Sequence, residues 1–218
     1  LSGPLAIVGQ LAPAPRIDVQ ADLKGQLDRH AAADVEIKVD ATGTELNLEV
    51  RELLAKAGAA QLMLSGTARR TTLAAPWQLE GKTKLSDFDP LPWFPGEPDT
   101  AWRRGPHRFT GDAEFAFTAP SPMQFPVGVG DLLEWLPTLQ GEALMSLHPS
   151  QLAGVALRGE AALKSVAPNR SRLTAKLEAA GNWLTAQGEW ARGDAGRSDQ
   201  WSFGLSAPQL AALAPLRL

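Results

Sequence analysis

The stretch that decides the fold is Ala33-Asp-Val-Glu-Ile-Lys-Val-Asp-Ala41, in which every second residue is apolar and each residue between is charged. A period of two places the apolar side chains on one face of a β-strand and the charged ones on the other. Such a strand belongs to an antiparallel sheet with one face in water, because strands of a parallel sheet read as continuous apolar runs.

The same alternation recurs along most of the chain. Clear examples are residues 17–24, 46–51, 77–85, 109–117, 155–164, 172–179 and 201–205, with weaker ones at 5–11, 59–68, 139–147 and 182–191. Helical signals are sparse and short, at Glu52–Ala59, Asp131–Leu136 and Pro208–Leu213. The sequence therefore predicts an all-β protein of about a dozen antiparallel strands with one or two short helices.

Composition narrows the class of function. The chain has 218 residues and a net charge of -3, which argues against a nucleic-acid binder that relies on positive charge. It has no Cys, so disulfides, thiolate metal sites and cysteine nucleophiles are ruled out. The chain starts at Leu1 and not at Met, and its first residues already show a structured pattern. We therefore expect it to be an internal segment of a longer protein.

Three stretches interrupt the strand pattern, at residues 87–108, 118–130 and 192–200. Strand character continues across them, so we predict one domain spanning 1–218. An alternative division has two sub-repeats, 1–86 and 109–218, joined by the Pro-rich insertion 87–108.

No catalytic constellation stands out, and we predict a non-enzymatic protein without cofactor or metal. The carboxylates alternate with Lys and Arg on the charged face of each strand, as solvated cross-strand pairs do. His107 lies near two Arg residues in a predicted loop. Basic residues scattered in a loop usually serve solubility, and we favour that interpretation over an anion-binding site.

A short motif with Gly between apolar and small residues recurs in strand phase. Its copies are Leu64-Ser-Gly-Thr-Ala68, Leu79-Glu-Gly-Lys-Thr83, Phe109-Thr-Gly-Asp-Ala113, Leu139-Gln-Gly-Glu-Ala143 and Leu157-Arg-Gly-Glu-Ala161. Glycine inside a strand marks a bulge or a close approach by another group. We expect these glycines to kink the sheet or to keep a concave apolar surface open.

The apolar faces of a dozen strands must be covered by something. Two sheets packed as a sandwich, one sheet closed as a barrel, or an open sheet curled like a taco around a ligand would each achieve this. Periodicity alone leaves the three open.

Several phrases resemble the TamB-like proteins of Gram-negative bacteria, within the AsmA-like superfamily. They are Trp77-Gln-Leu-Glu-Gly-Lys-Thr-Lys-Leu-Ser-Asp-Phe-Asp-Pro90, Leu91-Pro-Trp-Phe-Pro-Gly96, Trp102-Arg-Arg-Gly-Pro-His-Arg-Phe109 and the closing Trp201–Pro215. The resemblance implies a curled β-taco with an open apolar groove, in a periplasmic protein anchored in the inner membrane.

The resemblance also implies a function, namely carriage of phospholipid between the inner and outer membranes in support of outer-membrane biogenesis. Its partners would be phospholipid acyl chains and, through other parts of the full-length protein, an outer-membrane barrel of the TamA type. The residues that we predict to line the groove are Val19, Leu23, Val35, Ile37, Val39, Leu46, Leu48, Leu79, Leu85, Phe115, Phe117, Leu157, Leu163, Leu173, Leu177 and Phe203.

Two alternatives remain at this stage. A protein of the same shape would act as a chaperone if its edge strands paired with unfolded outer-membrane proteins. A closed β-sandwich would instead be a binding or structural module, with a packed core and no lipid.

Overall fold

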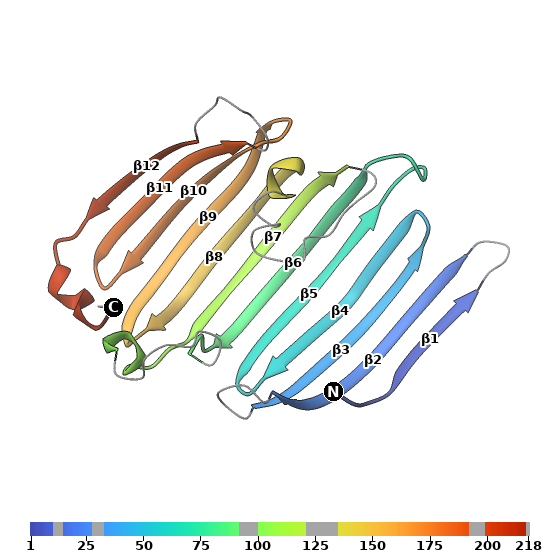
Figure 1. The fold of residues 1–218 in the computed structure, drawn as a ribbon, viewed down its shortest axis with the longest axis horizontal. Coiled ribbons are helices and arrows are strands. Elements are labelled where there is room, and N and C mark those ends of the chain that lie inside the picture. Colours follow the sequence, from blue (N-terminus) through green and yellow to red (C-terminus); the bar gives the residue numbers. More distant parts are fainter. Residues whose placement is uncertain (11–14, 28–32, 92–99, 121–134, 192–198, 217–218) are drawn as a thin grey trace.

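The chain folds into one open antiparallel sheet (Figure 1). The computed structural model describes residues 1–10, 15–27, 33–91, 100–120, 135–191 and 199–216. Twelve strands follow one another in sequence order, so each is paired with its chain neighbours, and β1 and β12 form the two edges. The predicted all-β class is confirmed. Within the described residues the strands form neither a second packed sheet nor a closed barrel.

The bounds of the elements are as follows. The strands are β1 Leu5–Gln10, β2 Arg16–Leu27, β3 Ala33–Thr44, β4 Asn47–Ala57, β5 Ala60–Arg69, β6 Trp77–Phe88, β7 Phe109–Ala119, β8 Gln140–Leu152, β9 Val155–Ala167, β10 Arg170–Ala179, β11 Asn182–Ala191 and β12 Gln200–Ser206. The 3₁₀ helices are η1 Ala101–Arg103, η2 Leu136–Thr138 and η3 Leu210–Leu216.

The helix predicted at Glu52–Ala59 is wrong, because β4 runs through this segment as a strand. Val50 pairs with Gly66 and Leu53 with Leu64, so Arg51 and Glu52 together face one residue of β5. Because of this β-bulge, two successive residues of the same face, Val50 and Leu53, lie three positions apart in the sequence instead of two. A spacing of three apolar positions resembles the period of a helix.

Similar bulges lie at Ser86–Asp87 in β6 and at His148–Pro149 in β8. A recurring glycine on the neighbouring strand lies opposite the residue that precedes each bulge: Gly66 opposite Val50, Gly111 opposite Leu85 and Gly159 opposite Leu147.

Two tight hairpins are formed by Ala-Gly pairs. Ala153 and Gly154 between β8 and β9 have φ angles of 52° and 77°, and Ala180 and Gly181 between β10 and β11 have 46° and 79°. Two positive φ angles in a two-residue loop match the right-handed twist of the flanking strands.

The other predicted irregular segments are partly described. Of the helix expected at Asp131–Leu136, residues 131–134 lie outside the described residues, and Leu136 begins η2. The helix expected at Pro208–Leu213 is the 3₁₀ helix η3. Most of 118–130 and 192–200 also lies outside the described part. Segment 87–108 joins β6 to β7, which pair directly, so the sheet is continuous across it.

The best-buried residues lie in the second half of the sheet. Ala119, Leu139, Val155, Leu157 and Leu163 are each less than 8% exposed. The short helices pack there: η2 contacts β10, and η3 contacts both β9 and η1. The first half has fewer buried side chains, which leaves its apolar face accessible.

Candidate functional site: the apolar face of the sheet

One face of the sheet is apolar across all twelve strands. Residues directly opposite in antiparallel strands share a face, so the pairing register follows that face from edge to edge. One row consists of Ile7, Val19, Ala41, Val50, Gly66, Gly81, Phe115, Ala143, Leu163, Leu173, Gly188 and Trp201. None of its members is charged or polar. We call this side the apolar face and the opposite side the charged face.

The predicted lining residues lie on this face, with one exception. The register of the strands places all of them except Leu46 on the apolar face. Leu46 lies in the turn between β3 and β4, outside the pairing, and is 38% exposed. The prediction failed there because the alternation in the sequence starts at Leu46, whereas the strand begins at Asn47.

Sequence reasoning missed the middle of the first half. Leu53, Ala55, Leu62 and Leu64 belong to the apolar face through β4 and β5. Leu53 and Ala55 were missed because the bulge at Arg51–Glu52 interrupts the alternation, and Leu62 and Leu64 because the apolar Met63 between them weakens the pattern of β5. The signal that would have found them is the resumed alternation of Leu53 and Ala55 after an adjacent pair of charged residues.

The apolar face is incompletely covered. The chain exposes 14056 Å² for a mass of 23.2 kDa, whereas a compact monomer of that mass exposes about 9,700 Å². Residues from interior strands contribute, including Leu48 at 41%, Leu62 at 37% and Met145 at 38%. A single sheet without a second layer accounts for this excess.

Two adjoining hollows mark the apolar face of β3 to β8. One, of about 500 Å³, is lined by Leu85, Phe88, Phe109, Met145, Leu147 and neighbouring residues. The other, of about 410 Å³, is lined by Leu1, Val35, Ile37, Ala55, Leu62, Leu85, Phe88 and neighbouring residues. Leu85 and Phe88 line both hollows, which therefore adjoin, and we call the two together the apolar depression.

The ends of the strands in the second half are capped. The Asn182 side chain, 2% exposed, donates hydrogen bonds to the carbonyls of Ala179 and Gln209 at 3.0 Å each. It also accepts one from the backbone N–H of Gln209 at 2.9 Å. This side chain ties the start of η3 to the turn between β10 and β11. At the other end of the strands, Pro137 of η2 is fully buried.

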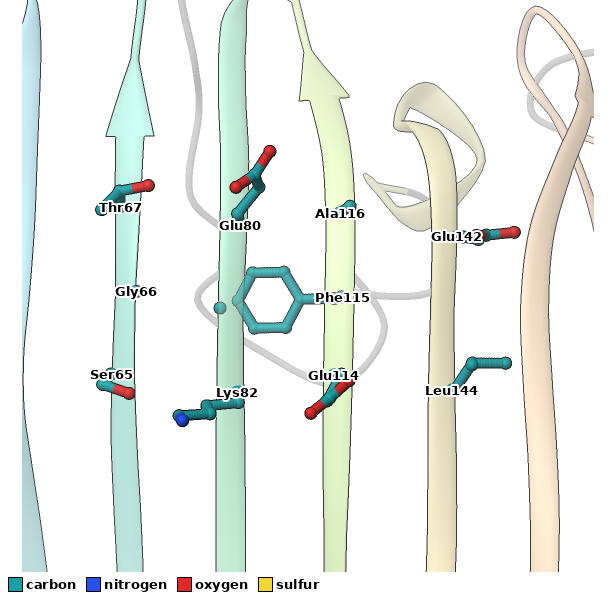
Figure 2. Close-up of a pocket in the computed structure, with 11 residues that line it drawn as sticks. Ser65, Gly66, Thr67, Glu80, Lys82, Glu114, Phe115, Ala116, Glu142 and Leu144 are labelled. Atoms are coloured by element: carbon teal, nitrogen blue, oxygen red, sulfur yellow. The ribbon is translucent and has the colours of Figure 1, made fainter.

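Aromatic rings fill the space that the glycines leave on this face. Phe115 extends from β7 towards β6 (Figure 2), and a Cβ placed on Gly81 would lie 2.7 Å from its Cζ. Trp201 of β12 lies over Gly188 of β11 in the same way, with ring atoms 2.2 Å from the position of a Cβ. The rings of Trp190, Trp201 and Phe203 follow each other at centroid distances of 6.0 and 6.2 Å.

The charged face carries cross-strand ion pairs, as predicted. Lys38 of β3 lies 3.9 Å from Asp22 of β2, and Lys56 of β4 lies 3.4 Å from Glu36 of β3. Lys38 also lies 3.0 Å from Glu36 within its own strand. Further pairs join Asp40 to Arg51, Glu178 to Arg158, and Glu189 to Arg172. The Arg51 guanidinium lowers the pKa of Asp40, the Lys38 ammonium lowers that of Glu36, and the Arg172 guanidinium lowers that of Glu189.

This charged face also has a shallow hollow, of about 480 Å³, over the central strands (Figure 2). Most of its lining residues belong to the charged face by register, among them Thr67, Glu80, Lys82, Glu114 and Glu142. Hollows thus lie on both faces of the sheet.

The charged face offers no acid–base constellation that we can identify among the described residues. His148 pairs with Asp112 on its exposed surface, and His107 accepts a hydrogen bond at Nδ1 from the backbone N–H of Ala153 at 3.2 Å. His107 therefore fastens the segment before β7 to the turn between β8 and β9. Within the described ranges, His, Asp and Glu nowhere gather in a group of three that could hold a metal ion.

In the part of the chain that the structure describes, no helix has the length and apolar character needed to cross a lipid bilayer.

Comparison of the chain with protein-family models, with curated proteins and with solved structures gave no match.

Proposed function

We propose that this chain is a non-enzymatic sheet segment that holds phospholipid acyl chains against its apolar face. In this proposal it is part of a periplasm-spanning protein of the TamB and AsmA type, which carries phospholipid between the inner and outer membranes and so supports outer-membrane biogenesis. The observation that carries the proposal is the row without charged or polar side chains from Ile7 to Trp201, opposite a face rich in ion pairs.

The energetics favour a ligand made of methylene groups. Each CH₂ removed from water contributes about 0.8 kcal/mol, so an acyl chain is held without any specific polar contact. The apolar depression around Leu85 and Phe88 offers such contact. A sugar or a peptide would need hydrogen-bond partners that the side chains of this row do not supply.

The test is whether phospholipid accompanies the purified chain. We expect native mass spectrometry and solvent extraction to find bound phospholipid after removal of detergent. Matched variants come from two adjacent apolar residues of β8, since Met145 lies on the apolar face and Leu144 on the charged face. Met145→Arg should abolish the bound lipid because a charge faces the acyl chain, and Leu144→Arg should leave it unchanged.

Equal lipid content in both variants, or none in the unaltered chain, would refute acyl-chain binding by this face. Circular dichroism of each variant reports whether the sheet is intact.

A further inference from the structure

The charged face carries a depression of its own, on the side of the sheet opposite the apolar depression. One hollow, of about 700 Å³, is lined by Asp40, Glu52, Met63, Lys84, His148 and neighbouring residues. It adjoins the hollow of about 480 Å³ over the central strands, because Ser65, Lys82 and Glu114 line both. We call these two together the charged hollow.

The charged hollow holds an excess of negative charge. Its carboxylate residues outnumber its Lys and Arg residues by six to three: Asp40, Glu52, Glu80, Asp112, Glu114 and Glu142 against Arg51, Lys82 and Lys84. The difference equals the net charge of the whole chain, which is -3. The rest of the sequence is therefore balanced, and the net charge of the chain is concentrated on this part of the charged face.

Three of these carboxylates surround an alanine. Glu80 and Glu142 pair with Ala116 from its two sides, and Glu114 lies on the same face two residues before it (Figure 2). Glu142 has Lys164 at 3.7 Å, whereas the described residues give Glu80 and Glu114 no ion pair. Since no three of the described carboxylate and histidine residues gather closely enough to hold a metal ion, these carboxylates suit cations carried on separate side chains.

Exposed apolar side chains lie among these charges. Met63 and Leu144 face this side by register, opposite Lys84 and Glu114, and are 40% and 57% exposed. Lysine and arginine lay their methylene stems along apolar surface and keep the charged head free for water or a carboxylate. The hollow therefore offers both parts of a long basic side chain a matching surface.

We propose that the charged hollow is a docking surface for a segment of a partner protein that is rich in lysine and arginine. The stems of these residues lie over Met63 and Leu144, and their charged heads meet the carboxylates around Ala116. Single exposed ion pairs are weak, so the affinity comes from several of them acting together with the stems. Docking here does not depend on lipid, because the apolar depression lies on the other face.

Fluorescence anisotropy with a labelled peptide of alternating lysine and serine tests the docking. We expect saturable binding to the unaltered chain that weakens as the salt concentration rises, because salt screens exposed charges. Delipidated and lipid-loaded protein should bind the peptide equally. A peptide of alternating glutamate and serine is the reference and should not bind. Failure of the lysine peptide to bind, or equal binding of both peptides, would refute the docking surface whatever the lipid content.

Charge reversal locates the peptide on the protein. Glu114→Lys should weaken binding about tenfold, because it replaces an attraction by a repulsion at the centre of the hollow. Glu45→Lys is the matched control, since it changes the net charge equally in the exposed turn between β3 and β4 and should bind like the unaltered chain.

Glu114→Gln only removes the charge and should weaken binding less, which keeps the test decisive if a lysine opposite Lys82 disturbs the fold. If Glu45→Lys weakens binding as much as Glu114→Lys, the peptide responds to net charge alone and the proposal is overturned.

The apolar part of the hollow has its own test. Leu144→Ser should weaken binding of the lysine peptide about fourfold, the effect of one methylene group returned to water. Leu184→Ser is the matched control, because Leu184 is similarly exposed, at 41%, but lies on the apolar face. Equal affinity of the two variants would refute packing of the stems on Leu144.

Discussion

Gly81 illustrates how the apolar face depends on single residues. A Cβ at this position would lie 2.7 Å from the Cζ atom of Phe115 and 2.9 Å from the carbonyl oxygen of Ser65. The ring can rotate away, but the carbonyl belongs to the pairing between β5 and β6. Gly43 lies on the same face with more room, since its nearest neighbours are Leu48 Cδ1 at 3.4 Å and the carbonyl oxygen of Asn47 at 3.7 Å.

Gly81→Ala should therefore lower the free energy of unfolding by about 1–3 kcal/mol, the range for overpacking a fitted site. Gly43→Ala should leave it unchanged or raise it by up to about 1 kcal/mol, because alanine restricts the unfolded chain. Urea denaturation of both variants measures the difference. Equal stability would mean that the central strands separate easily enough to accept a methyl group.

Paired carboxylates on the charged face make the stability of the fold depend on pH. Hydrogen bonds from Arg51 lower the pKa of Asp40 from its ordinary value of 3.8, and those from Lys38 lower the pKa of Glu36 from 4.5. A carboxyl group with a lowered pKa in the folded state stabilises the fold above its ordinary pKa and loses that effect as the pH falls.

We expect the unfolding temperature to fall as the pH drops from 5 through these ordinary values of 4.5 and 3.8. Arg51→Gln should make the fall shallower, because Asp40 then loses its partner at every pH. Arg69→Gln is the control and should keep the slope of the unaltered chain, because Arg69 pairs with Asn47 and Gln78 and not with a carboxylate residue. An acid dependence that is unaffected by Arg51→Gln would show that other carboxylates govern it.

At the level of one element, β4 shows why register matters more than composition. Its bulge at Arg51–Glu52 allows Leu48 and Val50 to share a face with Leu53 and Ala55, although the first two are at even sequence positions and the last two at odd ones. If Val50, Arg51, Glu52 and Leu53 all paired in regular alternation, one set would turn to the charged face, because side chains alternate strictly along a strand.

Deleting Arg51 should therefore preserve the fold, because Val50 and Leu53 are then two positions apart and can still pair with Gly66 and Leu64 in regular alternation. Arg51→Ala retains the residue count and loses only an ion pair at the surface, so its far-ultraviolet circular dichroism should match that of the unaltered chain. A deletion variant that loses its strand content or aggregates would show that the fold requires the bulge itself.

The same bulge marks the limit of prediction from sequence. Uninterrupted alternation, as in Val35 to Ala41, identifies both the strand and its apolar side, and the structure confirms both. Where two adjacent charged residues break the phase, a local pattern cannot distinguish a bulge from the start of a helix. The decision comes from the partner strand, since Gly66 and Leu64 pair across the interruption.

For the whole molecule, the decisive property is a sheet with a single layer. An accessible surface of 14056 Å² exceeds that of a compact monomer of this mass by roughly 4,000 Å². In a closed sandwich an arginine on the inner face would be buried without a partner, and the fold would fail. On an open face the long side chain extends into water, and the fold survives.

Ile37→Arg separates these outcomes, because Ile37 lines the apolar depression. In the full-length parent we expect the variant to accumulate normally but to lose phospholipid transport. An acyl chain cannot compensate the charge of an arginine in its path. Outer-membrane integrity measures the loss of transport. Glu36→Lys, the neighbouring residue on the charged face, is the control and should retain transport. Failure of Ile37→Arg to fold would indicate a face that is packed in the parent, and an unchanged outer membrane would contradict carriage of lipid along this face.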